Sequence, residues 1–150
     1  MIKPLIARQR AAQACVDRFN GRALDWGRAD CARLAAHALH GLGHPCAPLK
    51  GARYRSERAA MRHLLSLGHR GLMPVLDALG HPRIAPAMAL PGDIIAMATP
   101  AEGWDCALTI ALGNNRVLGF AEGGEGMVCV PFQPDLTHAL TAWRVEPCRR

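Results

Sequence analysis

The residues best suited to chemistry lie in one short segment, DWGRADC, which ends at Cys31. Asp30 is a favoured N-cap residue, and apolar residues with helical spacing follow it. Cys31 would then lie in the first turn of a helix, where free backbone N–H groups and the helix dipole stabilise a thiolate. The same N–H groups can form an oxyanion hole for acyl transfer. The segment is therefore typical of a cysteine nucleophile, although a cysteine placed here is also a common buried core residue.

A thiol nucleophile needs a base within hydrogen-bond distance, and a third polar group usually orients that base. The chain contains seven histidines. His37 and His40 follow Cys31 by more than one helical turn, so their side chains would project past the thiol. Of the others, His138, just before the last expected strand, is the candidate for a replacement base. The alternative is that His138 is a surface or capping residue.

A second group of residues has side chains that could bind a metal. Residues three apart share a helix face, and the loop after the helix could supply two further ligands suited to zinc; the four are His37, His40, His44 and Cys46. Their spacing matches no established zinc signature, and histidines also gather at helix C-termini because of the dipole. We therefore expect no metal and no cofactor, and metal binding by this group stays open as an alternative.

Helices in the first half of the chain would position Cys31. Apolar residues at three- and four-residue spacing, together with capping and stop signals, predict four helices, at residues 4–19, 31–42, 56–67 and 71–80. Asn20-Gly21 would end the first helix, and Ser56 would cap the third.

After Pro82 the pattern changes to short runs of β-branched and apolar residues. Three prolines within residues 81–93 predict an irregular connection. Strands are expected at residues 94–98, 106–112, 116–121, 127–132 and 141–145, with hairpin turns at 113–115 and 123–126. The prediction is an α+β fold in which N-terminal helices pack on a C-terminal antiparallel meander. We find no linker that would divide residues 1–150 into more than one domain.

Composition places the chain among ordinary globular proteins. Its 150 residues are 50% hydrophobic and 20% charged, which is enough to bury a core without staples. The six cysteines never form a CxxC pair, so they are expected to be free thiols. No apolar run is long enough for a membrane span, and the N-terminus lacks the apolar region of a signal peptide. We therefore expect the protein to be made and folded in a cytoplasm.

The formal charge of +6 raises the question of nucleic acid. The basic residues are scattered along the chain, and there is one tyrosine. Proteins that bind single strands interleave basic residues with exposed aromatic side chains, a pattern that is missing here. Nucleic acid is therefore not an expected partner, because net charge alone indicates solubility and loose association.

The segment DWGRADCARLAAHAL resembles the nucleophile segment of the NlpC-type cell-wall peptidases, where Trp-Gly or Tyr-Gly is followed closely by Asp-Cys and a helix. It is more similar to a family of small proteins encoded among phage and prophage tail genes, which carry WGxxDC and a C-terminal strand like AWRV. PGDIIAM, at Pro91–Met97, resembles that family's Gly-Asp strand, and ALTIALGNNRVLGFAEGGEGMVCVPF resembles its core hairpins. The resemblance covers about residues 22–145 and implies a minimal NlpC-like, papain-like fold.

The chain departs from the active peptidases at two positions. In those enzymes the strand that precedes a Leu-Gly turn opens with the catalytic histidine. Counting back from Leu112-Gly113 puts that position at Ala107, and the third, orienting position falls at Gly119. Neither side chain can take a proton from Cys31 or orient a base. The resemblance therefore implies a degenerate active site.

Two main functions follow from the resemblance. The favoured one is a structural or assembly component of a phage tail tip, a virion protein made in the host cytoplasm that contacts hub and distal tail proteins. The alternative is an active cysteine hydrolase that cleaves peptidoglycan peptides during phage entry, with Cys31 as nucleophile. A nucleic-acid or metal-binding module is a third possibility with less support. The sequence thus leans toward a protein that is not an enzyme.

Overall fold

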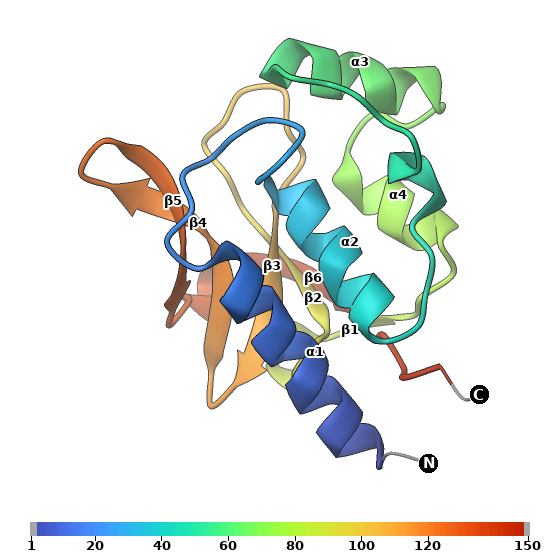
Figure 1. Cartoon of the computed structure of the whole chain (residues 1–150), viewed down its shortest axis with the longest axis vertical. Coiled ribbons are helices and arrows are strands. Elements are labelled where there is room, and N and C mark those ends of the chain that lie inside the picture. Colours follow the sequence, from blue (N-terminus) through green and yellow to red (C-terminus); the bar gives the residue numbers. More distant parts are fainter. Residues whose placement is uncertain (1–2, 149–150) are drawn as a thin grey trace.

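Helices fill the first half of the chain and strands fill the second half in the computed structural model, which describes residues 3–148 (Figure 1). The four α-helices of this part are α1 (Pro4–Phe19), α2 (Cys31–Gly41), α3 (Glu57–Ser66) and α4 (Leu72–Ala78). Three short 3-10 helices also occur: η1 (Ala47–Leu49), η2 (Pro86–Met88) and η3 (Leu136–His138). The four predicted helices are confirmed within two residues at each end. Among the residues described, no helix is both long and apolar enough to cross a membrane.

The strands form one six-stranded antiparallel sheet with the order β1-β6-β2-β3-β4-β5. They are β1 (Arg83–Ile84), β2 (Ile94–Met97), β3 (Ala107–Gly113), β4 (Arg116–Gly123), β5 (Gly126–Phe132) and β6 (Ala139–Trp143). Neighbours along the chain pair from β2 to β5, as the predicted meander requires, and Asn114 and Asn115 make the β3–β4 turn with φ of 52° and 58°. The α+β architecture, with helices first and an antiparallel sheet after them, is therefore confirmed.

The meander prediction is wrong for the last strand, β6. Instead of extending from β5, β6 returns to the opposite side and pairs with β2. β1 then pairs with β6, Arg83 opposite Trp143 and Ile84 opposite Ala142, within a segment expected to be irregular. A two-residue strand between prolines has no periodicity of its own, and distant pairing alone creates it.

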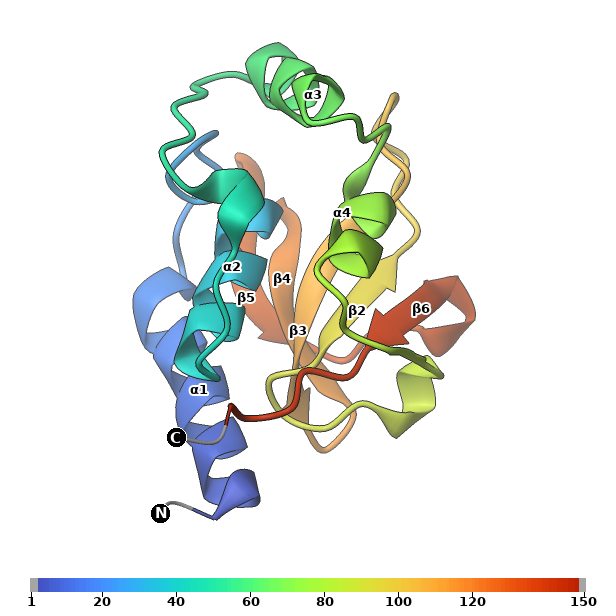
Figure 2. The same ribbon diagram turned by 90° about the vertical axis from the view of Figure 1, so that its right-hand side faces the viewer.

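Successive side chains of β3 project from opposite faces of the sheet, so they belong to two different hydrophobic cores. Leu108 and Ile110 belong to the larger core, on the face against which α1 and α2 lie (Figures 1 and 2). Ala111 belongs to a smaller cluster on the opposite face, with Ile95, Val117 and Ala142. This two-faced pattern follows from the period of two in a strand. It determines which residues of the sheet can reach the N-terminus of α2.

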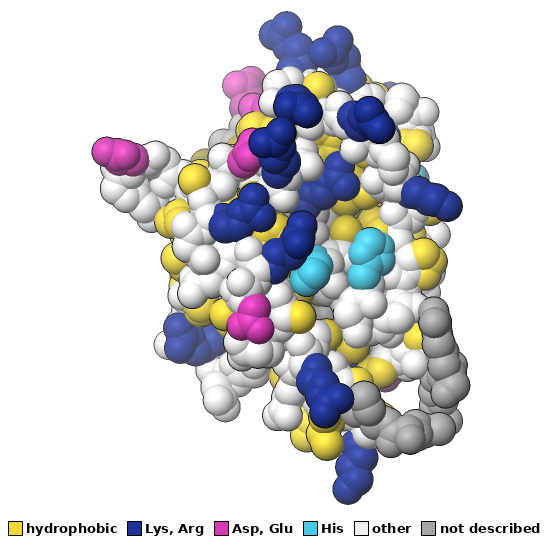
Figure 3. Space-filling view, in the orientation of Figure 1, with side chains coloured by type: hydrophobic (Ala, Val, Ile, Leu, Met, Phe, Trp, Pro, Cys, Tyr) yellow, Lys and Arg dark blue, Asp and Glu magenta, His cyan; other side chains and the backbone are white. Residues whose placement is uncertain are grey.

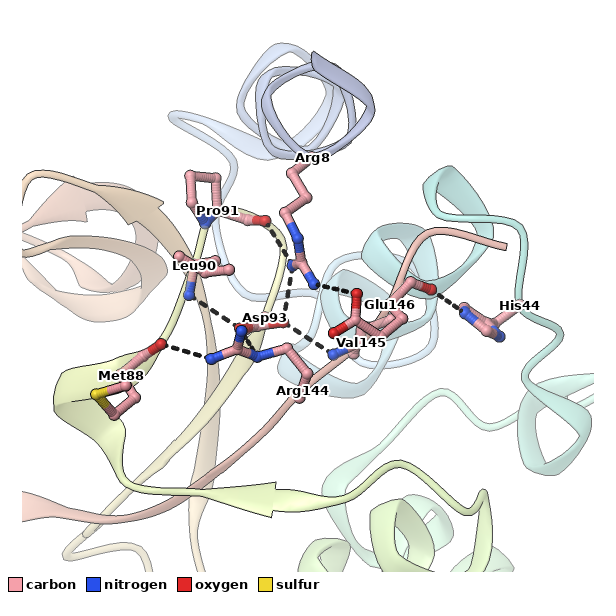
Figure 4. A network of polar contacts seen from close by, with 9 residues as sticks. All are labelled: Arg8, His44, Met88, Leu90, Pro91, Asp93, Arg144, Val145 and Glu146. Carbon is pink, nitrogen blue, oxygen red and sulfur yellow. Dashed lines mark hydrogen bonds and ion pairs between the residues drawn. The ribbon is translucent and has the colours of Figure 1, made fainter. Parts of the chain in front are cut away.

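A buried ion-pair network joins the start of β2 to distant parts of the chain (Figure 4). The side chain of Asp93 is fully buried, and its Oδ1 accepts hydrogen bonds from Arg8 Nη1 at 2.9 Å and from the Val145 backbone N–H at 2.8 Å. Its Oδ2 accepts from the Leu90 N–H at 2.9 Å and lies 3.1 Å from Arg144 Nε. The network thereby fixes α1, the turn before β2 and the segment after β6 to one another.

We expect Asp93→Asn to destabilise the fold by about 3–5 kcal/mol, because it removes the buried countercharge of Arg8 and leaves that guanidinium only the exposed carboxylate of Glu146. Urea unfolding followed by circular dichroism measures the change. Arg83→Gln is the control, since it breaks the Arg83–Asp77 pair, whose side chains are 48% and 44% exposed. The control should lose much less stability. Equal losses in the two variants would contradict the role given to Asp93.

Candidate functional site

The carboxylate of Asp30 organises the segment before α2. Asp30 is almost fully buried, and its Oδ1 accepts a hydrogen bond from the Arg33 N–H at 2.8 Å, which makes it the N-cap that the sequence predicts. Its Oδ2 accepts from the Gly27 N–H at 2.9 Å and from the Tyr54 hydroxyl at 2.8 Å. Asp30 therefore holds together the turn before α2, the first turn of that helix and the loop that carries Tyr54.

A steric constraint explains why glycine follows tryptophan in the motif. Gly27 has a φ of +88°, and a Cβ atom on it would lie 1.9 Å from the backbone oxygen of Tyr54. No residue with a side chain fits there without moving that backbone. The neighbouring Trp26 stacks on Trp104, with ring centroids 5.7 Å apart and planes 9° from parallel. The motif thus sets the close approach of two loops near Cys31.

Cys31 lines a small, mostly apolar pocket beside this pair of tryptophans. The pocket has room for little more than one water molecule. Its wall is formed by residues from α2, α3, α4, the loops before α2 and α3, and the loop before β3: Trp26, Asp30, Cys31, Ala32, Leu49, Tyr54, Ala60, His63, Leu64, Leu72 and Trp104. The Trp104 indole donates to Glu57 Oε2 at 3.2 Å, which ties the loop before β3 to the start of α3.

The environment of Cys31 favours the neutral thiol. Burial raises its pKa to about 12, and the carboxylates of Asp30 and Asp105 act in the same direction. A hydrogen bond from the backbone of Leu108 lowers the pKa by less than burial raises it. The helix N-terminus alone would have stabilised a thiolate, so this outcome differs from the simple expectation for the position. Near neutral pH, Cys31 is a protonated thiol.

Neither strand position that the resemblance assigns to catalysis faces Cys31. Ala107 alternates with Leu108, so it starts from the same face of the sheet as Thr109 and Ala111, away from α2. Gly119 lies on that face too, and a Cβ atom on it would come within 2.7 Å of Thr109 Cγ2. Position 119 therefore has no room for an orienting side chain unless Thr109 moves.

His63 is the pocket residue that sequence reasoning did not place. It lies on α3, half-buried, with its ring centroid 6.2 Å from that of Tyr54. Its Nε2 is 2.6 Å from the carbonyl oxygen of Pro48, which can only accept, so Nε2 carries the hydrogen. In the neutral ring, Nδ1 is then free to accept a proton. The available signal in the sequence is helical spacing, because His63 lies three residues after Ala60, which is buried on the inner face of α3.

The other candidate histidines lie elsewhere. His138, the expected replacement base, lies exposed in η3 and is not part of the pocket wall. His37 packs edge-on against Phe19, and His44 packs against His81. Within residues 3–148, no three side chains of the types that bind metals come close enough to hold an ion. The possible cluster around His37 is therefore not assembled in this part of the chain.

The negative charge of Asp30 leads to a prediction for the pKa of the Cys31 thiol. Asn retains the N-cap geometry but removes the carboxylate that raises the pKa of the thiol, so Asp30→Asn should lower the pKa of Cys31 from its value of about 12. The pH dependence of alkylation, read by mass spectrometry of the Cys31 peptide, measures the shift. The variant pKa should stay above the ordinary value near ~8.5, because burial remains the larger cause.

Exposed Cys148 provides an internal comparison in the same sample. In the unaltered protein at neutral pH, Cys31 should be alkylated far more slowly than Cys148, because roughly one thiol in 10⁵ is ionised about five pH units below its pKa. Labelling of Cys31 as fast as Cys148 would mean that the thiol is neither buried nor held neutral.

Comparison with known proteins gives one family match. Residues 5–145, nearly the whole chain, match the family described as Domain of unknown function (DUF6950). No curated protein and no solved structure matches the chain. The match spans the Asp30-Cys31 segment, all the helices and strands described above except the first residue of α1, and the Asp93 network up to Val145. This chain therefore belongs to the DUF6950 family.

Proposed function

We propose that this protein is a structural or assembly component of a phage tail tip, with an NlpC-like, papain-like fold that does not catalyse hydrolysis. The resemblance of WGxxDC, PGDIIAM and AWRV to proteins of phage and prophage tail genes supports the tail assignment. One observation carries the loss of catalysis. The two strand positions that would supply the base and the orienting group, Ala107 and Gly119, lie on the face of the sheet away from the half-buried Cys31, whose thiol pKa is raised by its surroundings.

Exposed apolar side chains provide surfaces that tail proteins such as the hub and distal components could cover. Met88 and Leu90, in the proline-rich segment before β2, are 63% and 39% exposed. Leu136 in η3 and Leu140 in β6 are 43% and 49% exposed. In contrast, Trp104 stacks on Trp26 and is only partly exposed. The proline-rich segment is thus a better contact surface than the Trp104 loop.

The proposal is tested by genetic replacement in a phage or prophage that encodes this chain. Cys31→Ser should give the same number of complete, infective tails as the unaltered gene, because a scaffold does not use the thiol. Met88→Asp with Leu90→Asp should reduce tail assembly, since it places charge in the proposed contact surface. Normal folding of both variants is checked by thermal unfolding. If tails with Cys31→Ser were complete but failed to infect, while tails from the unaltered gene infected normally, the proposal would be overturned in favour of catalysis.

A cysteine hydrolase is the second candidate, and the position of His63 favours it. His63 lines the same pocket as Cys31, and the Pro48 carbonyl orients its ring as a third group would. In this reaction Nδ1 takes the thiol proton, and the sulfur attacks a peptidoglycan amide carbonyl. The C–N bond then breaks, and the proton passes to the leaving amine. Water next cleaves the acyl-enzyme and restores the thiol.

Purified peptidoglycan sacculi distinguish the two candidates. If the protein is a hydrolase, the unaltered chain releases new amino termini from sacculi, and both Cys31→Ser and His63→Gln abolish that release. His138→Gln, a change of the same type on an exposed residue outside the pocket, should leave the release unchanged. Under the assembly proposal the unaltered protein releases no amino termini at all. Activity that survives Cys31→Ser would exclude the thiol mechanism.

A further inference from the structure

Residues 50–70 concentrate positive charge at one end of the molecule. The segment contains six basic residues against one acidic residue, Glu57. All six basic side chains are exposed: Lys50, Arg53, Arg55, Arg58, Arg62 and Arg70. Figure 3 shows Lys and Arg side chains gathered at the top of the view, over the end where Figure 1 places α3.

Within residues 3–148, no carboxylate forms a salt bridge with these six residues. The ion pairs in this part of the chain involve three other arginines, Arg8, Arg83 and Arg144. The carboxylate of Glu57 accepts a hydrogen bond from the Trp104 indole. The charge of the segment is therefore left for solvent or a partner to neutralise.

Two arginines of α3 occupy positions where their positive charges lower the stability of the helix. Arg58 and Arg62 are four residues apart on the same helix face, where like charges destabilise a helix by about 0.2–0.5 kcal/mol. Arg58 also lies in the first turn, where a positive charge opposes the helix dipole. An anionic partner would remove both unfavourable terms.

An exposed leucine extends the charged face of α3. Leu65 is three residues after Arg62 and is 60% exposed, while Ala60 and Leu64 on the inner face are buried. Leu67, just after the helix, is 43% exposed. The outer face therefore combines cations with apolar surface, which suits a partner that has both carboxylates and apolar side chains.

A protein partner fits this surface better than nucleic acid. Binding of single strands depends on exposed aromatic side chains that stack on bases. The aromatic residue of the segment, Tyr54, is 7% exposed, and its hydroxyl donates to Asp30. No exposed Phe, Tyr or Trp ring is therefore available between residues 50 and 70.

We infer that residues 50–67, the loop before α3 and the outer face of that helix, form a docking surface for an acidic segment of a partner protein. Carboxylates of the partner pair with Arg58 and Arg62, and an apolar side chain packs on Leu65. The inference rests on the proposed assembly role only in taking the partner to be a protein. It does not depend on whether Cys31 is reactive.

Fluorescence anisotropy with a labelled synthetic peptide of about 20 residues tests the surface. The peptide forms an amphipathic helix with glutamates on one face and leucines beside them. It should bind the full chain, and Arg58→Glu with Arg62→Glu should weaken binding by at least about tenfold, because two attractive pairs become repulsive. Arg10→Glu with Arg116→Glu is the matched control, since both residues are exposed and the net charge changes equally. The control should bind within about twofold of the unaltered chain.

Three results would overturn the inference. Equal weakening in both double variants would mean attraction by net charge alone. Unchanged binding of a peptide with glutamine in place of glutamate would mean that the carboxylates are not recognised. Tighter binding of a single-stranded oligonucleotide than of the peptide would assign the surface to nucleic acid. None of these results depends on the tail-assembly test with Cys31→Ser, so failure of the surface and failure of the proposed function can be told apart.

Discussion

The buried carboxylate of Asp93 is the constraint on which the arrangement of the elements depends. A charge with no exposure is tolerated only when it is paired and fully hydrogen-bonded, and the partners of Asp93 come from α1, from the turn before β2 and from the segment after β6. These parts are distant in sequence, so the network forms only when helices and sheet are already in their final register. Because α1 packs against α2, fixing α1 to the sheet also fixes the helix whose first turn carries Cys31.

A second buried carboxylate, Asp30, shows how similar burial leads to a different local chemistry. Asp93 is balanced by two arginines, whereas Asp30 is held by two backbone N–H groups and a phenol hydroxyl, which are neutral donors. Its negative charge is therefore felt by the neighbouring thiol, and it raises the pKa of Cys31 together with burial. The residue that gives α2 its favourable start thus works against a thiolate at the next position. This conflict weakens the case for Cys31 as a nucleophile as it stands.

The helices, the meander and the cap at Asp30 could be predicted because their signals are local, in helical spacing, turn residues and capping side chains. β1 and the return of β6 to β2 could not, since they depend on pairing between distant segments. The candidate site was harder to predict from the sequence for the same reason. Cys31 is recognisable from its neighbours, but the pocket wall draws on Tyr54, His63 and Trp104 from separate elements. Counting along β3 gave the position Ala107 without giving the face of the sheet from which it projects.

The helix α3 contributes both to the pocket at Cys31 and to the proposed docking surface. Its inner face supplies Ala60, His63 and Leu64 to the wall of the pocket, while its outer face carries Arg58 and Arg62. In Figures 1 and 2 the helix lies at one end of the molecule, beyond the sheet. A ten-residue helix is only marginally stable by itself, so its position depends on its packing on the inner side and its contacts on the outer side. A partner that neutralises the outer face would therefore also hold the helix that supplies one wall of the pocket at Cys31.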